Sequence, residues 1–407
     1  MPSLMPVGEI APSDGSLPEQ ARYEIALQPL GIYIHVPFCT TRCGYCDFNT
    51  YTAAELGSAP GASRASYVDA AIQEIELAAR VLGADAPMVS TIFIGGGTPT
   101  VLPPDDLGLL VTAVRDRLGL AEDAEVTTES NPESIDAAGL HRLRELGFNR
   151  ISFGMQSAVP HVLNTLDRMH TPGRSQQAIA EAKTAGFANT SLDLIYGTPG
   201  ESAADWQESV DAALAASPEH ISAYALIVEG GTRLAARIRR GELPPPDDDD
   251  LADKYLMAEG QFTAAGYSGY ELSNWSTCAA TRCRHNVGYW RSHHWWGIGP
   301  GAHSHVGGVR WWNVKHPQAY ASKLAAGVSP AQAREMLSAE QRRVERIMLE
   351  LRLADGISTS LLTVTEQDRL ADLIARRLAV VNDHTLILTT RGRLLADAVL
   401  RELLDWS

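Results

Sequence analysis

Apolar segments rich in β-branched residues recur between residues 32 and 225, and most are separated by stretches whose apolar residues have helical spacing. Alternation of strands and helices is typical of a parallel sheet with right-handed connections. We therefore predict an α/β fold built on a parallel βα array. The six expected strands are Ile32–Val36, Thr91–Ile94, Glu125–Glu129, Ile151–Phe153, Ser191–Ile195 and Ile221–Ala225.

Capping residues mark some of the helices between these strands. Ser134 is expected to cap a helix that ends at Gly147, and a later helix is expected to end at Gly186, because glycine adopts the left-handed conformation that ends many helices. In parallel βα arrays, ligands bind at the carboxyl ends of the strands. The chemically interesting side chains should therefore follow the strands rather than precede them.

The pattern changes after Gly241. A Pro- and Asp-rich break precedes a helix that extends through Phe262, and an aromatic-rich stretch follows it. From about Leu337 we expect two helices, a hairpin around Asn382-Asp383 and a final helix from Arg391. This last part is similar to a small α+β, winged-helix-like domain.

These patterns divide the chain into four parts. We expect a flexible N-terminal tail over residues 1–28, the βα core over 29–240, a linking region over 241–335 and the winged-helix-like domain over 336–407. With 407 residues and 45% hydrophobic content, the chain can fill one large core and a smaller one, or two domains.

Charge and hydropathy exclude several kinds of partner. The formal net charge is -15, and the dense charge run Asp247–Asp250 is acidic, so the basic surface that nucleic-acid binding needs is not expected. No apolar run of about 18 residues occurs, and the first residues lack the apolar core of a signal peptide. We expect a protein of the cytoplasm without an integral membrane segment, and five cysteines, three of them clustered, suit that reducing compartment.

Three cysteines lie within eight residues directly after the first expected strand. Thiolates from Cys39, Cys43 and Cys46 at this spacing predict three ligands of a [4Fe-4S] cluster, whose fourth iron stays open to a small molecule. The alternative is a zinc knuckle, although zinc ligands usually come as two Cys-x2-Cys-type pairs.

Four motifs together resemble a known family. They are Tyr33-Ile-His-Val-Pro-Phe-Cys39, Gly95-Gly-Gly-Thr-Pro-Thr100, Asp193-Leu-Ile-Tyr-Gly-Thr-Pro199 and His285-Asn-Val-Gly-Tyr-Trp290. In this combination the chain resembles the radical S-adenosylmethionine (SAM) superfamily, within the branch of anaerobic coproporphyrinogen III oxidases and HemW-type haem chaperones, and is most similar to the latter. The resemblance implies that the six strands form a partial (β/α)6, TIM-like barrel.

The resemblance also implies how SAM would be bound. The glycine block lacks the spacing of a dinucleotide site, but glycines let backbone amides approach a ligand closely. By resemblance, Gly96, Gly97 and Thr98 lie along the methionyl part of SAM, and Ala225 supplies a backbone contact near the adenine. Side chains at or near strand ends are implied to contact the charged groups and hydroxyls of SAM, namely Tyr33, Tyr45, Glu129, Gln156, Arg168 and Asp193.

The last motif is associated with haem in the chaperones that this chain resembles. His285 is the implied axial ligand, with Tyr289 and Trp290 as the apolar wall, and His285 and Tyr289 would share one face of a helix. The alternative is that His285 only hydrogen-bonds within an aromatic core. Cys283 is a possible further soft ligand, whereas we expect Cys278 to be incidental.

Residue 48 separates the two activities of this branch. In the oxidases a fourth cysteine follows the third after one residue, and here that position is Phe48. We therefore expect a haem chaperone that transfers haem to apo-haemoproteins of respiration, with an electron donor for the cluster. The alternative is oxygen-independent oxidation of coproporphyrinogen III to protoporphyrinogen IX, and a radical enzyme with another substrate is a third reading.

Overall fold

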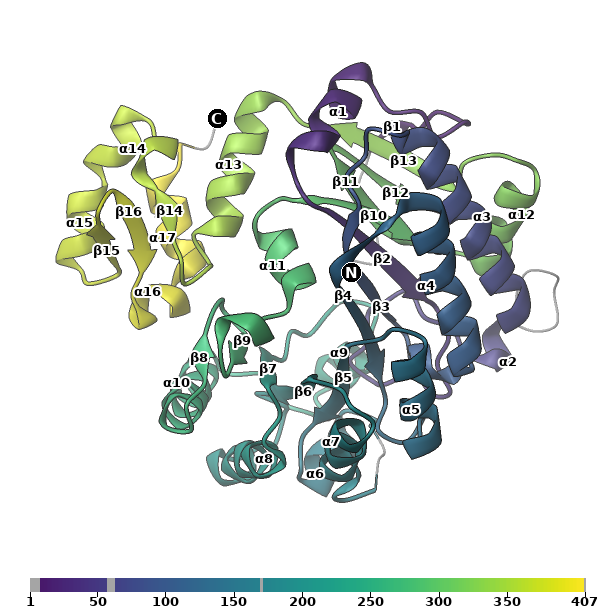
Figure 1. Cartoon of the computed structure of the whole chain (residues 1–407). Coiled ribbons are helices and arrows are strands. Elements are labelled where there is room, and N and C mark those ends of the chain that lie inside the picture. The colour runs from purple at the N-terminus through teal and green to yellow at the C-terminus, as the bar shows by residue number, and fades with distance from the viewer. Residues whose placement is uncertain (1–7, 57–62, 169–170, 406–407) are drawn as a thin grey trace.

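The computed structural model describes residues 8–56, 63–168 and 171–405, and all structural statements below concern these residues. They form one sheet of 13 strands, in the order β1-β13-β12-β11-β10-β2-β3-β4-β5-β6-β7-β9-β8, and a second sheet of three strands. Figure 1 shows the large sheet wrapped by helices, with the small sheet in a separate lobe.

Six neighbouring strands at the centre of the large sheet are parallel, which confirms the predicted βα array. They are β2 (Leu30–Val36), β3 (Val89–Gly96), β4 (Leu120–Ser130), β5 (Arg150–Gln156), β6 (Asn189–Tyr196) and β7 (His220–Ala225). All six are longer than the segments that predicted them, and several gain polar residues at their ends, such as Arg150, Gln156 and His220. Those polar ends supply the site described below.

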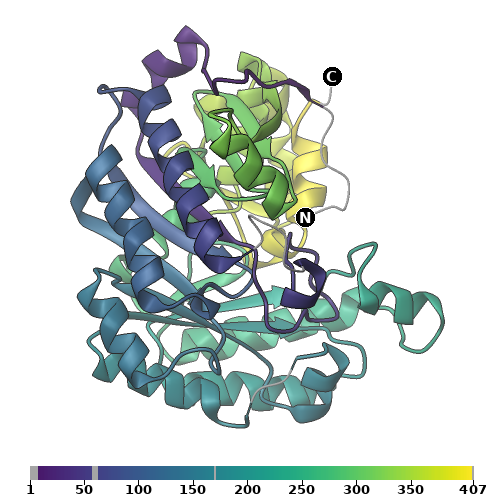
Figure 2. The ribbon, with the colours of Figure 1, turned by 90° about the vertical axis from the view of Figure 1, so that its right-hand side faces the viewer.

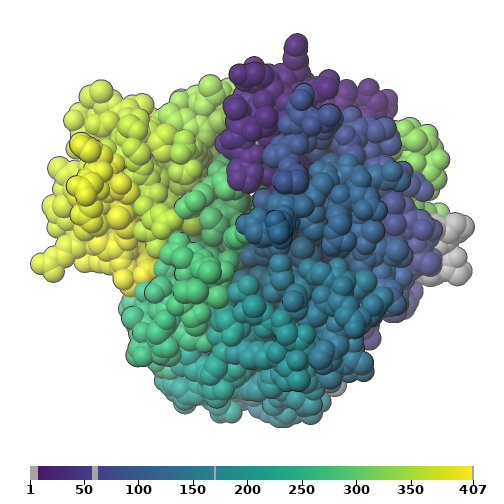
Figure 3. Space-filling view, in the orientation of Figure 1, coloured from purple at the N-terminus to yellow at the C-terminus, as the bar shows by residue number. Residues whose placement is uncertain are grey.

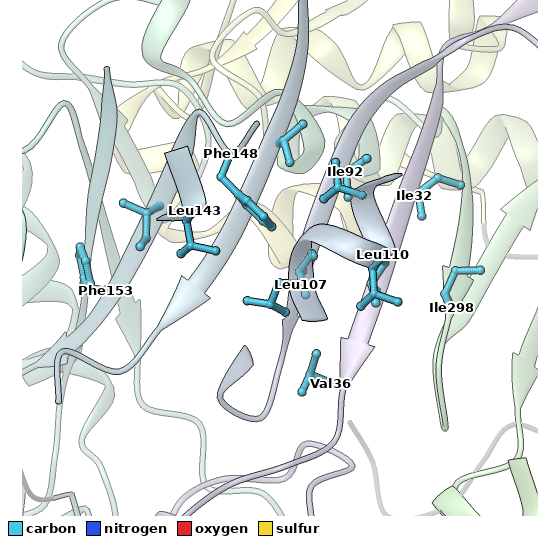
Figure 4. Close-up of a cluster of buried hydrophobic side chains, with 14 of the residues drawn as sticks. Ile32, Val36, Ile92, Leu107, Leu110, Leu143, Phe148, Phe153 and Ile298 are labelled. Carbon is cyan, nitrogen blue, oxygen red and sulfur yellow. The ribbon is translucent and has the colours of Figure 1, made fainter. Parts of the chain in front are cut away.

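Helices between these strands form the outer layer of the array, as Figures 1 and 2 show. They are α3 (Arg64–Leu82), α4 (Pro104–Leu118), α5 (Ala137–Glu145), α6 (Pro160–Thr165), α7 (Arg174–Thr184) and α8 (Ala203–Ala216). Their buried aliphatic side chains meet those of the strands, as in the group around Ile92, Leu107 and Leu110 in Figure 4. Burial of this continuous apolar layer is the main stabilising contribution to the array.

Two helix ends test the capping predictions. Gly186 has φ of +93° just after α7, so the predicted left-handed end is confirmed. The predicted cap of α5 is wrong: the side chain of Asp136, not that of Ser134, accepts a hydrogen bond from the backbone N–H of Gly139 at 2.8 Å. The Ser134 hydroxyl is instead engaged with Thr100 and with the carbonyl of Asn131.

Residues 8–28, which we expected to lie in a flexible tail, are instead built into the fold. Strand β1 (Glu9–Ile10) pairs with β13, and α1 (Glu19–Glu24) lies beside β11, as Figure 1 shows. Ala21 and Ile25 are buried in the main hydrophobic core. A two-residue strand has no periodicity, which is why the sequence pattern did not reveal it.

The region predicted to link the two domains extends the same sheet at both edges. Strand β9 (Asn274–Ser276) is antiparallel to β7, and β10 (His294–Ile298) is parallel to β2. The remaining helices and strands of this part are α10 (Asp248–Ala264), β8 (Ser268–Gly269), α11 (Arg284–Trp290), β11 (His303–Val306), β12 (Val309–Asn313), α12 (Pro317–Ala325) and β13 (Ala331–Met336). Two short helices belong to the preceding part, α2 (Ala53–Leu56) after β2 and α9 (Arg233–Arg239) after β7.

The C-terminal residues form a small α+β lobe with its own hydrophobic core, which Figure 3 shows at the left of the molecule. A hairpin turns at Asp383 and His384, both of which have positive φ. Its elements are α13 (Ala339–Glu350), β14 (Ile357–Ser358), α14 (Val364–Asp368), α15 (Leu370–Ala375), β15 (Ala379–Asn382), β16 (Thr385–Leu388), α16 (Thr390–Leu394) and α17 (Ala396–Leu403). Of the helices in the described residues, none combines the length and apolarity needed to cross a membrane.

Candidate functional site

The cysteine loop follows β2 and is fixed by backbone hydrogen bonds from three other segments. The N–H of Cys39 donates to the carbonyl of Tyr51 at 3.0 Å, and the N–H of Gly44 donates to Leu166 at 2.9 Å. The carbonyl of Gly44 accepts from the N–H of Leu234, at the start of α9, at 2.8 Å. The loop is therefore held at the carboxyl end of the strands, where the sequence predicted it.

The thiols of Cys39, Cys43 and Cys46 are partly buried and close enough to influence one another. Burial, with smaller effects of Cys46 and Cys43, raises the pKa of Cys39 to about 11, and burial also raises the pKa of Cys46. In the described part of the chain, no three His, Cys, Asp or Glu side chains converge as ligands of one metal ion do. A four-iron cluster is wider than one ion, so its ligand sulfur atoms lie further apart.

The predicted glycine block passes directly beside this loop. A Cβ atom on Gly97 would lie 2.5 Å from the carbonyl oxygen of Phe38 and 3.0 Å from Sγ of Cys39, so only glycine fits. Gly96 has φ of +110° and faces Nδ1 of His35 in the same way. Thr98 points its hydroxyl toward Sγ of Cys39 at 4.0 Å. The backbone of the block therefore lies directly beside the cysteine loop, while the N–H groups of Gly96, Gly97 and Thr98 donate to Glu129, Val36 and Phe38 respectively.

Two half-buried carboxyl groups, those of Glu129 and Asp193, line an internal cavity beside the parallel strands. Glu129, at the end of β4, accepts from the N–H of Gly96 at 3.1 Å, and burial together with Asp193 raises its pKa to about 8. Burial likewise raises the pKa of Asp193, although the hydroxyl of Ser152 donates to it at 2.9 Å. Neither carboxyl group forms an ion pair with any described residue, so both suit a cationic ligand. SAM carries an ammonium and a sulfonium group.

The polar ends of the Gln156 and Arg168 side chains both lie next to Gly154. A Cβ on Gly154 would lie 2.7 Å from Nε2 of Gln156 and 2.8 Å from Nη2 of Arg168, and Gln156 itself has φ of +65°. The guanidinium of Arg168 also lies 3.7 Å from Sγ of Cys43, while its Nε is buried without a hydrogen-bond partner in the described residues. A ligand carboxylate near the cluster loop would satisfy that nitrogen. The donor set therefore fits both the cluster and SAM.

An internal cavity of about 120 Å³ joins several predicted residues to others that the sequence did not single out. Tyr33, Glu129 and Asp193 line it, and the hydroxyl of Tyr33 hydrogen-bonds with Nδ1 of His35 at 3.0 Å. The unpredicted lining side chains include Arg150, Ser152, Ser191, His220, Ser222 and Tyr224. Polar residues at alternate positions within apolar strands were the signal that would have found them.

Two predicted SAM residues lie elsewhere around the array. Tyr45 packs with Leu166 and Leu234 between the cysteine loop and α9, where it helps to hold the loop. Ala225 is the last residue of β7 and pairs with Tyr196. Neither lines the internal cavity.

The motif that begins at His285 lies on helix α11. Its His285 and Tyr289 line the same internal cavity as Tyr33, Glu129 and Asp193, so the structure brings the residues predicted for haem and some of those predicted for SAM together. His285 sits against Gly31 and Thr91, near the starts of β2 and β3, and its Nδ1 hydrogen-bonds with the Thr91 hydroxyl at 2.8 Å. Its Nε2 hydrogen-bonds with the hydroxyl of Tyr289 at 2.9 Å, so the two residues share a helix face as predicted. Burial lowers the pKa of His285 to about 3. In this conformation His285 is hydrogen-bonded within an aromatic core, which is the alternative to haem ligation that the sequence left open.

Glu125, on β4, holds α11 against the sheet through hydrogen bonds. The sequence did not single out this residue. Its carboxylate accepts from the N–H groups of Arg284 and His285, each at 3.0 Å. The buried thiol of Cys283 lies 3.6 Å from the same carboxylate, and burial raises the pKa of that thiol to about 12. Cys278 is exposed. Trp290, the last residue of α11, has a buried Nε1 without a partner among the described residues.

Comparison with known proteins identifies the family to which the chain belongs. The family model of the radical SAM superfamily matches residues 33–213. The protein named heme chaperone HemW from Mycobacterium tuberculosis (strain ATCC 25618 / H37Rv) is 51% identical over 93% of this chain and 95% of its own length. The HemW of Bacillus subtilis (strain 168) is 33% identical over 90% of this chain and 97% of its own length.

A solved structure described as coproporphyrinogen III oxidase (HemN) from Escherichia coli has a TM-score of 0.81 over 96% of this chain and 94% of that one. Its sequence identity is 23%, so the likeness extends to the fold alone. It supports an α/β fold of the radical SAM type over nearly the whole chain.

Proposed function

The chain belongs to the HemW family of the radical SAM superfamily, and we propose that it is a haem chaperone that binds a [4Fe-4S] cluster, SAM and haem and delivers haem to apo-haemoproteins. The proposal rests above all on 51% identity over 93% of the chain to the HemW of Mycobacterium tuberculosis. The cysteine loop, the glycine block and the carboxyl groups of Glu129 and Asp193 support the same proposal.

In this proposal each group of the site has a distinct task. Cys39, Cys43 and Cys46 would hold the cluster, which supplies a redox-active iron with an open coordination position when bound. Arg168 and Gln156 would receive the carboxylate of SAM, and Glu129 and Asp193 its positive charge. The buried surroundings would exclude water from the bound nucleotide.

Phe48 argues against the oxidase alternative. The position that follows the third cysteine after one residue is a fourth cysteine in the oxidases that the chain resembles, and here it is a phenylalanine whose side chain is 55% exposed. A phenyl ring offers neither a metal ligand nor a proton donor. The zinc alternative is set aside because the radical SAM family model spans residues 33–213, which include all three clustered cysteines.

The same proposal includes the partners that the family resemblance implies. These are apo-haemoproteins of respiration as haem acceptors and a one-electron donor for the cluster. We place the protein in the cytoplasm, because a cluster with an open iron needs a reducing compartment.

The test combines haem binding, haem transfer and oxidase assays on anaerobically reconstituted protein. We expect a Soret band on titration with haem, transfer of that haem to an apo-cytochrome, and unchanged coproporphyrinogen III in the presence of SAM and a reductant. Replacement of Cys39, Cys43 and Cys46 by alanine should remove iron and sulfide, whereas Cys278→Ala should leave both in place. Steady formation of protoporphyrinogen IX would establish the oxidase instead.

A further inference from the structure

Several polar side chains that line the internal cavity are already paired with other residues of the fold. The hydroxyl of Ser152 donates to Asp193 at 2.9 Å, and the hydroxyl of Ser191 lies 2.8 Å from Nδ1 of His220. The ring of His285 uses both of its nitrogens in hydrogen bonds. Groups of the lining that stay unpaired therefore indicate what the cavity can bind.

Thr127, on β4, is a lining residue whose hydroxyl has no partner. Its side chain is fully buried, and Oγ1 makes no hydrogen bond with any residue that the structure describes. A buried hydroxyl that loses water without a replacement costs free energy, so such groups usually meet a ligand or an ordered water. This hydroxyl is available to a molecule in the cavity.

Arg150, on β5, is a buried cation without an ion pair among the described residues. Only 2% of the residue is exposed, and its guanidinium makes one hydrogen bond there, from Nη1 to the carbonyl of Thr281 at 2.8 Å. Two nearby acids are engaged by other groups: Glu125 accepts from two N–H groups of α11, and Asp193 accepts from Ser152. Because buried charges are normally paired, Arg150 favours an anion in the cavity.

These two unpaired donors are neighbours in the sheet. Thr127 and Arg150 are directly opposite each other in the parallel register of β4 and β5, and both line the same cavity. A guanidinium matches the two oxygen atoms of a carboxylate, and a hydroxyl can donate to one of them. The pair therefore provides donors for one carboxylate group.

The size of the cavity limits the ligand to a small acid. Its volume is about 120 Å³, and a single water molecule needs roughly 10–15 Å³ of such space. Pockets for drug-sized ligands have volumes of roughly 300–1,000 Å³. The rings of Tyr33, Phe93 and Tyr289 also line the cavity and suit a short aliphatic chain. An acid of a few carbon atoms meets both limits.

Two carboxyl groups in the same cavity set a condition on this ligand. Glu129 and Asp193 repel an anion when they are ionised. In the proposed function these two groups receive the positive charge of SAM, which compensates their negative charge. A carboxylate should therefore bind more tightly when SAM is present, and by reciprocity it should strengthen the binding of SAM.

We propose that the internal cavity binds a small aliphatic carboxylate as a second ligand beside SAM, held by the guanidinium of Arg150 and the hydroxyl of Thr127. The dependence on SAM rests on the proposed function, whereas the two donors are features of the fold itself. The site is separate from the cysteine loop and uses none of the residues predicted to bind the cluster.

The experiment is calorimetric titration of the anaerobically reconstituted full chain with acetate, with and without SAM, at constant ionic strength. We expect saturable binding of acetate that SAM strengthens by about tenfold. Acetamide has a similar shape but no charge, so it should bind at least roughly tenfold more weakly than acetate. Pivalate carries the same charge on a bulkier body and should not bind.

The variant Thr127→Val separates binding from folding. Valine keeps the shape of the side chain without the hydroxyl, so acetate should bind roughly three- to tenfold more weakly. The Tm of the ligand-free protein should rise, because an unpaired buried hydroxyl is removed. Arg150→Gln should abolish detectable acetate binding. Thr112→Val, at an exposed position of α4, is the matched control and should bind acetate as the wild type does.

Three results would count against parts of this scheme. Wild-type protein that binds SAM but not acetate, or that binds acetate and acetamide equally, would overturn the carboxylate site. Unchanged acetate affinity in a folded Thr127→Val variant would overturn its location. Acetate binding without any binding of SAM would instead remove the SAM part of the proposed function and leave the carboxylate site in place. Circular dichroism of each variant separates loss of ligand from unfolding.

Discussion

Glu129 is half-buried and lines the internal cavity with a second acid, Asp193, so its ionisation affects how that cavity receives a cation. Its pKa is raised to about 8, so at pH 7 the carboxyl group of the free protein is mostly protonated. A raised pKa means that ionisation destabilises the folded state. The contribution of Glu129 to the free energy of unfolding is therefore full below the unfolded pKa of 4.5 and is lost as the pH rises through 8.

We predict that SAM binds more tightly as the pH rises from about 6.5 to about 8.5, because the cation binds the ionised form of Glu129. Glu129→Gln should weaken binding by roughly tenfold at the upper pH and flatten the pH dependence. Calorimetric titration with SAM across this range measures both effects. Glu122→Gln, an exposed position on the same strand, is the control. A pH-independent Kd in the wild type would contradict the prediction.

The candidate residues of the cluster site could be predicted from the sequence because they belong to short local motifs. The cysteine spacing and the glycine block each lie within a few consecutive residues, so their geometry follows from one loop. The partners of His285 could not be named in this way. Thr91 lies 194 residues away, and only the folded sheet brings its hydroxyl to the histidine.

At the scale of single elements, the start of α5 shows how a correct helix can be given the wrong cap. Ser134 and Asp136 both have side chains that cap helices well. The structure selects Asp136, because Ser134 is already held by Thr100, in the 3-10 turn Pro99–Val101 that follows β3. A competing tertiary hydrogen bond is invisible in the local sequence.

We predict that Asp136→Ala lowers the free energy of unfolding by about 1 kcal/mol, since the N–H of Gly139 loses its acceptor. Asp136→Asn keeps an acceptor oxygen at the same place and should be nearly neutral. Chemical denaturation of the two variants and the wild type measures the difference. Equal destabilisation by both substitutions would show that the side-chain charge, rather than the cap, matters.

The six parallel strands were predictable because each holds a short segment rich in apolar or β-branched residues, most of which are buried. The strands outside this set could not be predicted from the sequence. Strand β10 pairs with β2 although more than 250 residues separate them in the sequence, and the pairing leaves no local pattern. Long-range pairing of this kind therefore explains why the region after residue 241 was predicted to be a linking region.

At the scale of the whole molecule, charged groups join the C-terminal lobe to the barrel. Arg393 on α16 pairs with Glu259 on α10 at 2.7 Å, and these side chains are only 12% and 19% exposed. On the other side, Asp355 accepts from Arg282 and Arg291, which lie just before and just after α11. The lobe thus holds both ends of the helix that carries the motif, between α13 and the sheet (Figure 1).

We predict that Arg393→Met destabilises the attachment of the lobe by about 1–3 kcal/mol, because Glu259 would remain largely buried without its cation. Limited proteolysis should then separate the lobe from the barrel faster than in the wild type, and the Tm should fall. Arg391→Met, at an exposed position of the same helix, should leave both unchanged. If Arg393→Met resists protease as the wild type does, the apolar contacts alone hold the lobe.

The strand order has a consequence for biosynthesis. The cysteine loop emerges early from the ribosome, but Asn49, near its end, donates hydrogen bonds to the carbonyls of Pro300 and Lys315. Strand β1 likewise cannot pair until β13 has been synthesised, and the two residues of the Glu9–Arg334 ion pair are 325 positions apart in the sequence. Translation must therefore pass residue 334 before the sheet closes, and the nascent chain meanwhile exposes an unpaired edge of β2. Loading of metal and nucleotide into a finished site is thus a late, post-translational event.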